Sequence, residues 1–157
     1  MKFNRLLAIL VMFLGLIGVV LGGVFVGEGI IKNDLITDRM AVEKVTLALD
    51  PNNPTVTTQI NNASEAQQAA DKIAADRRKI APSYQELLNQ GTGKFDPTNS
   101  KDLSYAQAMN LENYLYMAVT AFGLIDVTLA AGVFMVVTGL AVGGAGLVLY
   151  RISRRSS

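Results

Sequence analysis

The residue that raises the sharpest chemical question is Asp126, a carboxylate inside the otherwise apolar run "AVTAFGLIDVTLAAG". A carboxylate within a bilayer can relay protons or bind a cation, whereas a carboxylate at the headgroup level only marks where the membrane ends. On insertion scales an Asp at the membrane centre costs about 2.5 to 3.5 kcal/mol, and most of this cost disappears at the interface. The role of Asp126 therefore depends on where its helix meets the membrane.

A second set of oxygen side chains has the spacing of the first half of a calcium-binding loop. Asp96, Thr98, Ser100 and Asp102 occupy alternate positions. Such loops also need Gly at the sixth position and a bidentate Glu at the twelfth, and the twelfth residue here is Gln107. The pattern therefore favours a helix cap, and we predict no metal site and no bound cofactor.

The composition excludes several classes of chemistry. The 157 residues include no His and no Cys, which removes imidazole bases, thiolate nucleophiles, the usual zinc sites and His-ligated haem. There is no nucleophile elbow, Ser-x-x-Lys motif or paired-carboxylate spacing. The formal net charge of +1 provides no field that would attract nucleic acid. We predict that the chain is not an enzyme and does not bind nucleic acid.

Half of the residues are hydrophobic, and they gather near the two ends of the chain. The run Leu6–Gly27 would form a helix of about 33 Å, which matches a hydrocarbon core of about 30 Å. The basic start Met1–Arg5 also fits a cleaved signal peptide, but the apolar region of a signal peptide spans only about 7 to 15 residues and ends in small residues. This run is longer and leads into Glu28, so we predict a retained membrane anchor.

The second apolar run, Leu115–Tyr150, would make a helix of about 54 Å and exceeds any bilayer. Arg151 sets its cytoplasmic limit. The 22 residues before it, as many as in the first run, place the membrane segment at 129–150. Asp126 then lies one turn beyond the outer boundary. In an antiparallel hairpin Lys32 comes within side-chain reach of Asp126, and we predict an interfacial ion pair between them.

The distribution of charge predicts the orientation. The two ends carry five basic residues and no acid, whereas segment 32–112 holds nine basic and eleven acidic residues. We predict a location in a bacterial cell membrane, and the positive-inside rule predicts that both termini are cytoplasmic and the central loop is extracytoplasmic. The expected parts are a tail and first membrane helix at 1–31, an extracytoplasmic domain at 32–112, a second long helix at 113–150 with its membrane part at about 129–150, and a basic tail at 151–157.

The extracytoplasmic part reads as mainly helical. The first helix should continue outward through Ile36, residues 45–49 alternate in an extended way, and "DPNNP" at 50–54 predicts a break. The next helix, within "NNASEAQQAADKIAADRRKIAP", should be capped by Asn62 or Ser64, with a Ser64-x-x-Gln67 capping box, and should stop before Pro82. Its small and apolar residues form a stripe at helical spacing: Ala66, Ala69, Ala70, Ile73, Ala74 and Ile80.

The extracytoplasmic part also contains a run of charged residues and the start of a last helix. The charge run Asp76–Lys79 is interpreted as a solvated face, and a last helix, capped by Asn99 or Ser100, should run unbroken into the second span. Part of the surplus apolar helix, which carries Tyr105, Met109, Tyr114 and Phe122, then needs cover from the extracytoplasmic domain or from a partner. The predicted fold class is an all-α membrane protein: a two-helix transmembrane hairpin with a mainly helical extracytoplasmic domain.

Glycines are spaced for close helix contact in both spans. Small residues four apart let helix backbones approach closely, as in Gly18-x-x-x-Gly22, Gly23-x-x-x-Gly27 and Gly139-x-x-x-Gly143. A further repeat of seven joins Gly132, Gly139 and Gly146. The simplest use is to pack the two spans on each other, and an oligomer interface is the alternative. The predicted helix-packing residues are Gly18, Gly22, Gly132, Gly139, Gly143 and Gly146.

The segments "MAVEKVTLA", "PSYQELL" and "LYMAVTAFGL", in this order between a glycine-rich first span and a second span, resemble small uncharacterised two-span membrane proteins of actinobacterial and related genomes. Some of these carry a ring-opening dioxygenase label, which implies a metal centre with His ligands. Since this chain has no His, we reject that activity here. The resemblance implies an architecture without a mechanism.

Two functions of different classes are left open. The first is an accessory subunit that packs against a larger membrane complex, such as an electron-transport assembly. The second is a self-associating membrane anchor whose outer domain binds an envelope component. The expected partners are other integral-membrane subunits, further copies of the chain, and lipid.

Overall fold

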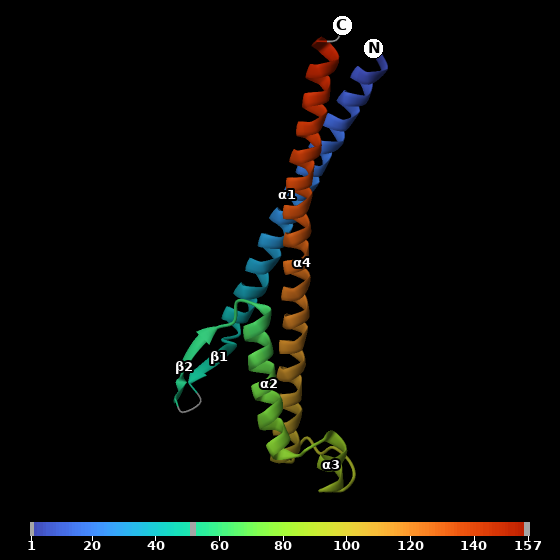
Figure 1. Cartoon of the computed structure of the whole chain (residues 1–157). Helices are drawn as coiled ribbons and strands as arrows, with labels where there is room; N and C mark the ends of the chain where they lie inside the picture. Colours follow the sequence, from blue (N-terminus) through green and yellow to red (C-terminus); the bar gives the residue numbers. More distant parts are fainter. Residues whose placement is uncertain (1, 51–52, 156–157) are drawn as a thin grey trace. The chain divides into compact units, whose positions relative to one another are not determined.

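The computed structural model describes residues 2–50 and 53–155. The order of elements (Figure 1) is α1 Lys2–Val42, β1 Thr46–Asp50, β2 Asn53–Gln59, α2 Ala63–Ile80, α3 Tyr84–Asn89 and α4 Ser100–Arg155. The chain is mostly helical, and α1 and α4 are both long and apolar enough to cross a membrane. The predictions that the first helix continues past Ile36 and that the last helix runs unbroken are confirmed.

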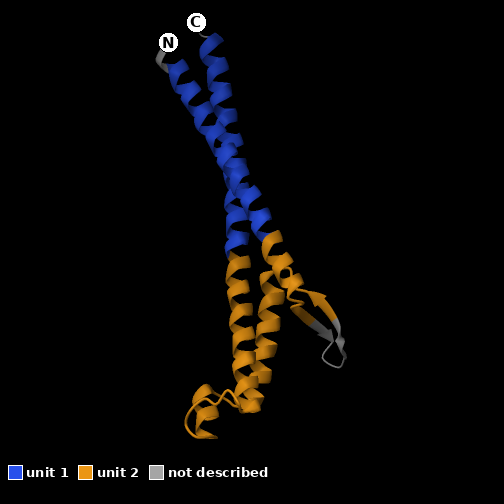
Figure 2. Ribbon diagram, turned by 180° about the vertical axis from the view of Figure 1, so that it is seen from behind, with its two compact units in different colours: residues 1–33, 124–157 blue, residues 34–123 orange. Residues whose placement is uncertain are grey.

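The residues form two compact units, which are described separately (Figure 2). Unit 1 consists of Met1–Asn33 and Leu124–Ser157 and contains parts of α1 and α4. Unit 2, Asp34–Gly123, contains the end of α1, both strands, α2, α3 and the beginning of α4.

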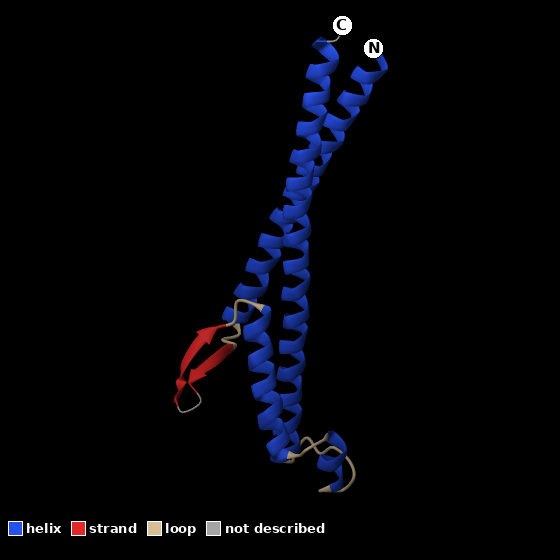
Figure 3. Ribbon diagram, viewed as in Figure 1, coloured by secondary structure: helices blue, strands red, loops and turns tan. Residues whose placement is uncertain are grey.

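The fold class needs one correction, because the chain is not all-α. β1 and β2 form an antiparallel two-stranded sheet in which Thr46 pairs with Gln59 and Asp50 with Asn53 (Figure 3). The extended stretch was recognised in the sequence, but its partner "NPTVTTQ" was not, although it is rich in the β-branched residues that favour strands. Of the predicted break at 50–54, residues 51–52 lie outside the described residues.

The end of α1 is a Schellman motif with an unusual residue at its left-handed position. The backbone N–H of Val45 donates to the carbonyl of Met40, and that of Lys44 donates to Ala41. Position C′ of this motif is usually glycine, because an L-residue in the left-handed region is strained. Here it is Lys44, with φ of 53°.

Replacement of Lys44 by Gly is therefore expected to stabilise unit 2. Relief of the left-handed strain should raise the free energy of unfolding by about 0.5 to 1 kcal/mol. Denaturant titration of the full chain measures the change. The matched control Lys44→Ala removes the same side chain and keeps the strain, so an equal gain in both variants would contradict this explanation.

Helix α2 begins where the sequence indicated, and its cap is Asn62, one of the two residues expected there. The Asn62 side chain accepts from the backbone N–H of Glu65 at 2.9 Å, and the Glu65 carboxylate accepts from the N–H of Asn61 at 2.7 Å. The expected Ser64–Gln67 box is therefore wrong. Both Asn62–Glu65 and Ser64–Gln67 have the three-residue spacing of a capping box. Asn62 is the cap because its backbone is extended, as an N-cap requires.

A stripe of small residues on α2 faces the interior of unit 2. The stripe predicted from helical spacing is buried at Ala66, Ala69, Ala70 and Ala74. α2 lies alongside the first part of α4 (Figures 1 and 3), and small side chains allow this close approach. At the end of α2 a cluster of Ala81, Leu87 and Tyr105 is buried, with Ile80 and Met109 packed against it. This cluster ties α2, α3 and α4 together.

Candidate functional site

The predicted helix-packing glycines all lie where α1 and α4 face each other in unit 1. A Cβ on Gly139 would lie 2.7 Å from both the carbonyl oxygen of Gly15 and the backbone nitrogen of Val19. A Cβ on Gly22 would lie 2.6 Å from the carbonyl oxygen of Gly132. Real Cβ atoms do not approach backbone this closely, so only glycine fits. We call this contact the glycine seam; its members on α1 and α4 are Gly15, Gly18, Gly22, Gly29, Gly132, Gly139, Gly143 and Gly146.

The helices are antiparallel in the glycine seam, because the early part of α1 meets the late part of α4. Gly146 contacts Met12, whereas Gly132 contacts Gly22 and Val26. This order of contacts shows the relative direction of the two helices within unit 1. The same contacts show which residues of α1 and α4 lie at the same level in unit 1.

Sequence reasoning missed Gly15 and Gly29. Together with Gly22 they repeat at intervals of seven, the same repeat that was noticed on α4, and this spacing was the signal that could have found them. By contrast, a Cβ on Gly23 or Gly27 would meet no described atom within 4 Å apart from neighbouring residues and the backbone of its own helix. The Gly23-x-x-x-Gly27 motif therefore lies off the seam.

The structure places Lys32 and Asp126 at the same level of the helix pair without forming an ion pair. Gly29 contacts Leu129, and three residues further along each helix stand Lys32 and Asp126. Both side chains are exposed. The ion pairs found among the described residues are Arg77–Glu112 and Lys79–Asp76. Proximity is thus supported by the register, and the pair itself stays a prediction.

The change Asp126→Asn should accordingly have a small effect. An exposed pair contributes about 0 to 1 kcal/mol, and the amide can still form hydrogen bonds. We expect unchanged insertion and a stability change within that range, measured by SDS titration of the full chain. A depth measurement adds a separate check: a spin label at position 126 in water-poor, oxygen-rich surroundings would place the residue inside the membrane.

The calcium-like stretch is a turn followed by a helix cap. The Asp96 carboxylate accepts from the backbone N–H of Thr98 at 2.8 Å, and these hydrogen bonds with Thr98 lower the pKa of Asp96. The Asp102 carboxylate accepts from the N–H of Asp96, and the Asn99 side chain accepts from the N–H of Lys101. Among the described residues no group of three or more His, Cys, Asp or Glu side chains could hold a metal ion.

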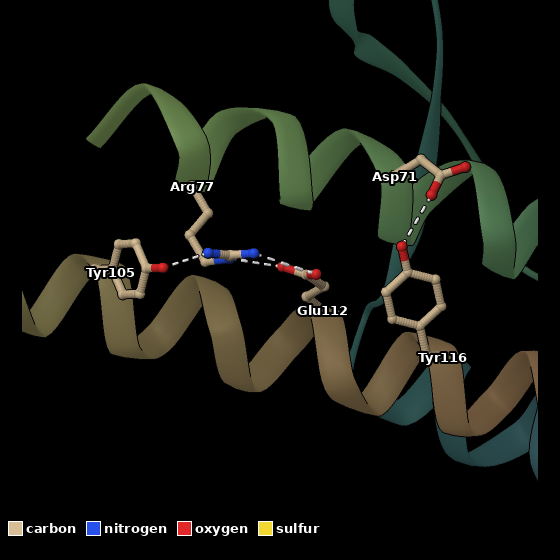
Figure 4. A network of polar contacts seen from close by, with 5 residues as sticks. All are labelled: Asp71, Arg77, Tyr105, Glu112 and Tyr116. Carbon is tan, nitrogen blue, oxygen red and sulfur yellow. Dashed lines mark hydrogen bonds and ion pairs between the residues drawn. The ribbon is translucent and has the colours of Figure 1, made fainter. Parts of the chain in front are cut away.

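The strongest polar cluster joins α2 to α4 and is centred on Arg77 (Figure 4). Its Nε atom lies 2.7 Å from the Glu112 carboxylate, and the two side chains are only 13% and 12% exposed. Arg77 also donates to the Tyr105 hydroxyl, and its guanidinium lies 5.0 Å from the centre of the Tyr105 ring. The hydrogen bond with Glu112 raises the pKa of Arg77, so the guanidinium stays charged.

A second polar contact lies further along the same two helices. The Tyr116 hydroxyl donates to the Asp71 carboxylate at 3.0 Å (Figure 4), and this hydrogen bond raises the pKa of Tyr116. Tyr105 and Glu112 are seven residues apart and Glu112 and Tyr116 are four apart, close to two turns and one turn of helix, so the three side chains share one face of α4. The cluster holds α2 and α4 in register.

Sequence reasoning missed Arg77 as an inward residue because it read Asp76–Lys79 as one solvated run. Asp76, Arg78 and Lys79 are indeed exposed. Arg77, however, continues the buried alanine stripe, three residues after Ala74. That spacing was the available signal, and it was outweighed by the charge of the surrounding run.

Unit 2 also contains an open groove between the end of α1 and α4. Its volume is about 580 Å³. The lining is apolar except at Arg39 on α1 and at Glu43, which directly follows α1; it consists of Arg39, Met40, Glu43, Val45, Leu111, Tyr114 and Leu115. Of the four bulky residues expected to need cover, Tyr105 and Phe122 are buried and Met109 is partly buried, whereas Tyr114 is 65% exposed. We call this feature the α1–α4 groove.

Comparisons of the sequence with protein-family models and with curated proteins, and of the chain with solved structures, find no match. The chemistry of the described residues is therefore the basis for any functional statement. That chemistry consists of close helix packing, one nearly buried ion pair and an open, largely apolar groove.

Proposed function

We propose that this chain is a two-span integral membrane protein that serves as a structural subunit of a larger membrane assembly. Its partners would be other integral-membrane subunits or further copies of the chain. In this proposal segments 6–27 and 129–150 cross a bacterial cell membrane, both termini are cytoplasmic, and the domain between the spans is extracytoplasmic. The role is to pack against proteins and hold them in place, without catalysis.

The outer faces of the glycine seam support membrane insertion. The seam brings the two backbones together through glycine and leaves the large apolar side chains on the outside, where Phe13 is 61%, Phe134 70% and Leu140 62% exposed. Soluble monomers rarely expose contiguous apolar surface of this kind. Lipid tails or neighbouring membrane helices can cover this surface and so avoid the cost of exposing it to water.

The observation that carries the proposal is the apolar surface of α4 in unit 2. Leu111, Tyr114 and Met117 are all exposed, and they precede the expected membrane segment by 12 to 18 residues. At a helical rise of 1.5 Å this is about 18 to 27 Å along α4. A hydrocarbon core of about 30 Å that covers residues 129–150 cannot also cover this patch. We therefore infer that a protein partner covers this apolar patch.

Quantitative mass spectrometry of the tagged full chain, purified from its own host membranes in mild detergent, tests the proposal. We expect stoichiometric protein partners or a self-assembly, and loss of that assembly in Tyr114→Lys. The matched control is Tyr84→Lys, at a tyrosine on α3 that is 44% exposed and does not line the α1–α4 groove. Elution of the wild-type chain as a lone monomer would overturn the proposal.

A further inference from the structure

An apolar crevice lies beside the glycine seam in unit 1. Its volume is about 510 Å³, and only apolar side chains and glycines line it. Three of the four lining residues on α4 are Gly139, Gly143 and Gly144, so the helix surface recedes there. We call this feature the seam crevice; its larger lining residues are Ile9, Met12, Phe13, Leu16, Val19 and Leu140.

Two arginines stand at the end of the seam crevice where the chain termini lie. The first part of α1 and the last part of α4 meet at this end of unit 1 (Figure 2). A Cβ on Gly146 would lie 3.1 Å from the carbonyl oxygen of Ala8. Arg5 lies three residues outward from Ala8, and Arg151 lies five residues outward from Gly146. The two arginines are therefore near the same level of the helix pair.

These arginines share helix faces with the lining of the seam crevice. Arg5 precedes Ile9 by one turn of α1, and Arg151 follows Gly144 by two turns of α4. The distance along α1 from Arg5 to Leu16 is about 16 Å. This is close to the thickness of one leaflet of the hydrocarbon core, about 15 Å. The crevice thus runs from the arginines through one leaflet.

The segments that carry the arginines contain no acidic residue. Arg151, Arg154 and Arg155 are exposed in the last turns of α4, and their spacing of three and four residues places them on one face. The sequence has no Asp or Glu before Glu28 or after Asp126, roughly 35 Å along the helices from the arginines. The planar guanidinium group suits a phosphate, whose oxygens accept two parallel hydrogen bonds from it.

We propose that the seam crevice and the arginines at its end bind an anionic phospholipid of the cytoplasmic leaflet. The phosphate of the headgroup lies between Arg5 and Arg151, and one acyl chain occupies the crevice. The positive-inside rule accounts for basic residues at this end, but it does not account for an apolar crevice that begins beside them. Basic pockets between membrane helices on the cytoplasmic side bind anionic headgroups in this way. The inference rests on the membrane insertion and orientation in the proposed function.

The two features together favour an anionic lipid over other occupants. A free phosphate would leave the apolar crevice empty. A further apolar helix would fill the crevice and leave the arginines without a counter-charge. A zwitterionic lipid would fill the crevice too, but its headgroup has no net charge and gains less from the arginines. Only an anionic lipid matches the charge and the crevice at once.

Native mass spectrometry of the delipidated full chain in mild detergent tests the headgroup site. The probes are phosphatidylglycerol and phosphatidylcholine with identical acyl chains. We expect one bound phosphatidylglycerol per chain, at least about tenfold tighter than phosphatidylcholine. Arg5→Gln and Arg151→Gln should each weaken phosphatidylglycerol binding by about fivefold, the usual contribution of one basic residue near anionic headgroups. The matched control Arg78→Gln, at an exposed arginine on α2 in unit 2, should not.

Filling the crevice tests the acyl-chain site. Gly144→Leu puts a large side chain into the crevice, at a position where a Cβ meets no described atom within 4 Å apart from neighbouring residues and the backbone of α4 itself. It should weaken binding of both lipids by about tenfold. The matched control Gly23→Leu, at an equally open position on α1 outside the crevice, should not. Glycerol phosphate, which has the anion without the chains, should not compete. Circular dichroism confirms that the helices remain.

The outcomes distinguish this inference from the proposed function. Equal affinity for the two lipids, or equal effects of Arg151→Gln and Arg78→Gln, overturns the site. Displacement of the lipid by glycerol phosphate, or unchanged binding in Gly144→Leu, overturns it as well. A chain that selects phosphatidylglycerol but purifies without protein partners overturns the subunit role and leaves the lipid site standing. A chain with stoichiometric partners and no lipid preference does the reverse.

Discussion

Replacement of Gly139 by Ala is expected to lower the free energy of unfolding by about 1 to 3 kcal/mol, the usual cost of overpacking. The new Cβ would lie 2.7 Å from the carbonyl oxygen of Gly15 and from the nitrogen of Val19. These are backbone atoms, so the two helices must move apart to admit it. Gly139→Leu should be more damaging, because its longer side chain enters the same contact.

Gly144 provides the matched control for this prediction. It stands on the same helix, and a Cβ at this position would meet no described atom within 4 Å apart from neighbouring residues and the backbone of α4 itself. Gly144→Ala should leave stability unchanged or raise it by up to about 1 kcal/mol, because alanine favours helix more than glycine does. SDS titration of the full chain compares the two variants, and equal stability of both would mean that the glycine seam does not hold the helices.

Removal of the Glu112 carboxylate should produce the second large effect. Glu112→Ala leaves the Arg77 guanidinium nearly buried without its anion. Breaking a buried pair costs about 3 to 5 kcal/mol, and the slight exposure of this pair lowers our expectation to about 2 to 4 kcal/mol. α2 should detach from α4, and protease sensitivity of unit 2 should rise together with the loss of stability.

Two variants show whether this loss comes from an unpaired charge. Asp76→Ala removes the exposed partner of Lys79 and should cost no more than about 1 kcal/mol. The double variant Arg77→Met/Glu112→Leu replaces both charges by apolar groups and should be more stable than Glu112→Ala alone. If the double variant is the less stable one, the cluster acts through specific hydrogen bonds and not through charge compensation.

Periodicity predicted the long elements well because their signals are strong and local. The two apolar runs, the alanine stripe of α2 and the stop before Pro82 follow from helix rise, burial spacing and the missing N–H of proline. The hairpin was half recognised, since β1 has an alternating pattern. Its partner β2 carries mostly polar residues, and its pairing depends on contacts that no local pattern records.

Among the candidate sites, only the glycine seam has a signal in the local spacing of the sequence. Glycine spacing indicated the seam because only a residue without a Cβ permits such close backbones, and the missed Gly15 and Gly29 share that spacing. Arg77 and the α1–α4 groove could not be derived in this way. Each depends on which helix lies against which face, and so on tertiary packing between segments 30 or more residues apart.

Labelling with a membrane-impermeant thiol reagent tests directly whether the chain spans the membrane twice with both ends in the cytoplasm. The chain has no cysteine, so Ser64→Cys and Ser156→Cys each introduce a single reactive thiol. Ser64 is exposed at the start of α2, in the domain expected outside the cell. We predict labelling at position 64 in intact cells, and labelling at position 156 only after the membrane is permeabilised. Labelling at position 156 in intact cells, or at neither position until permeabilisation, would contradict a two-span protein with cytoplasmic ends.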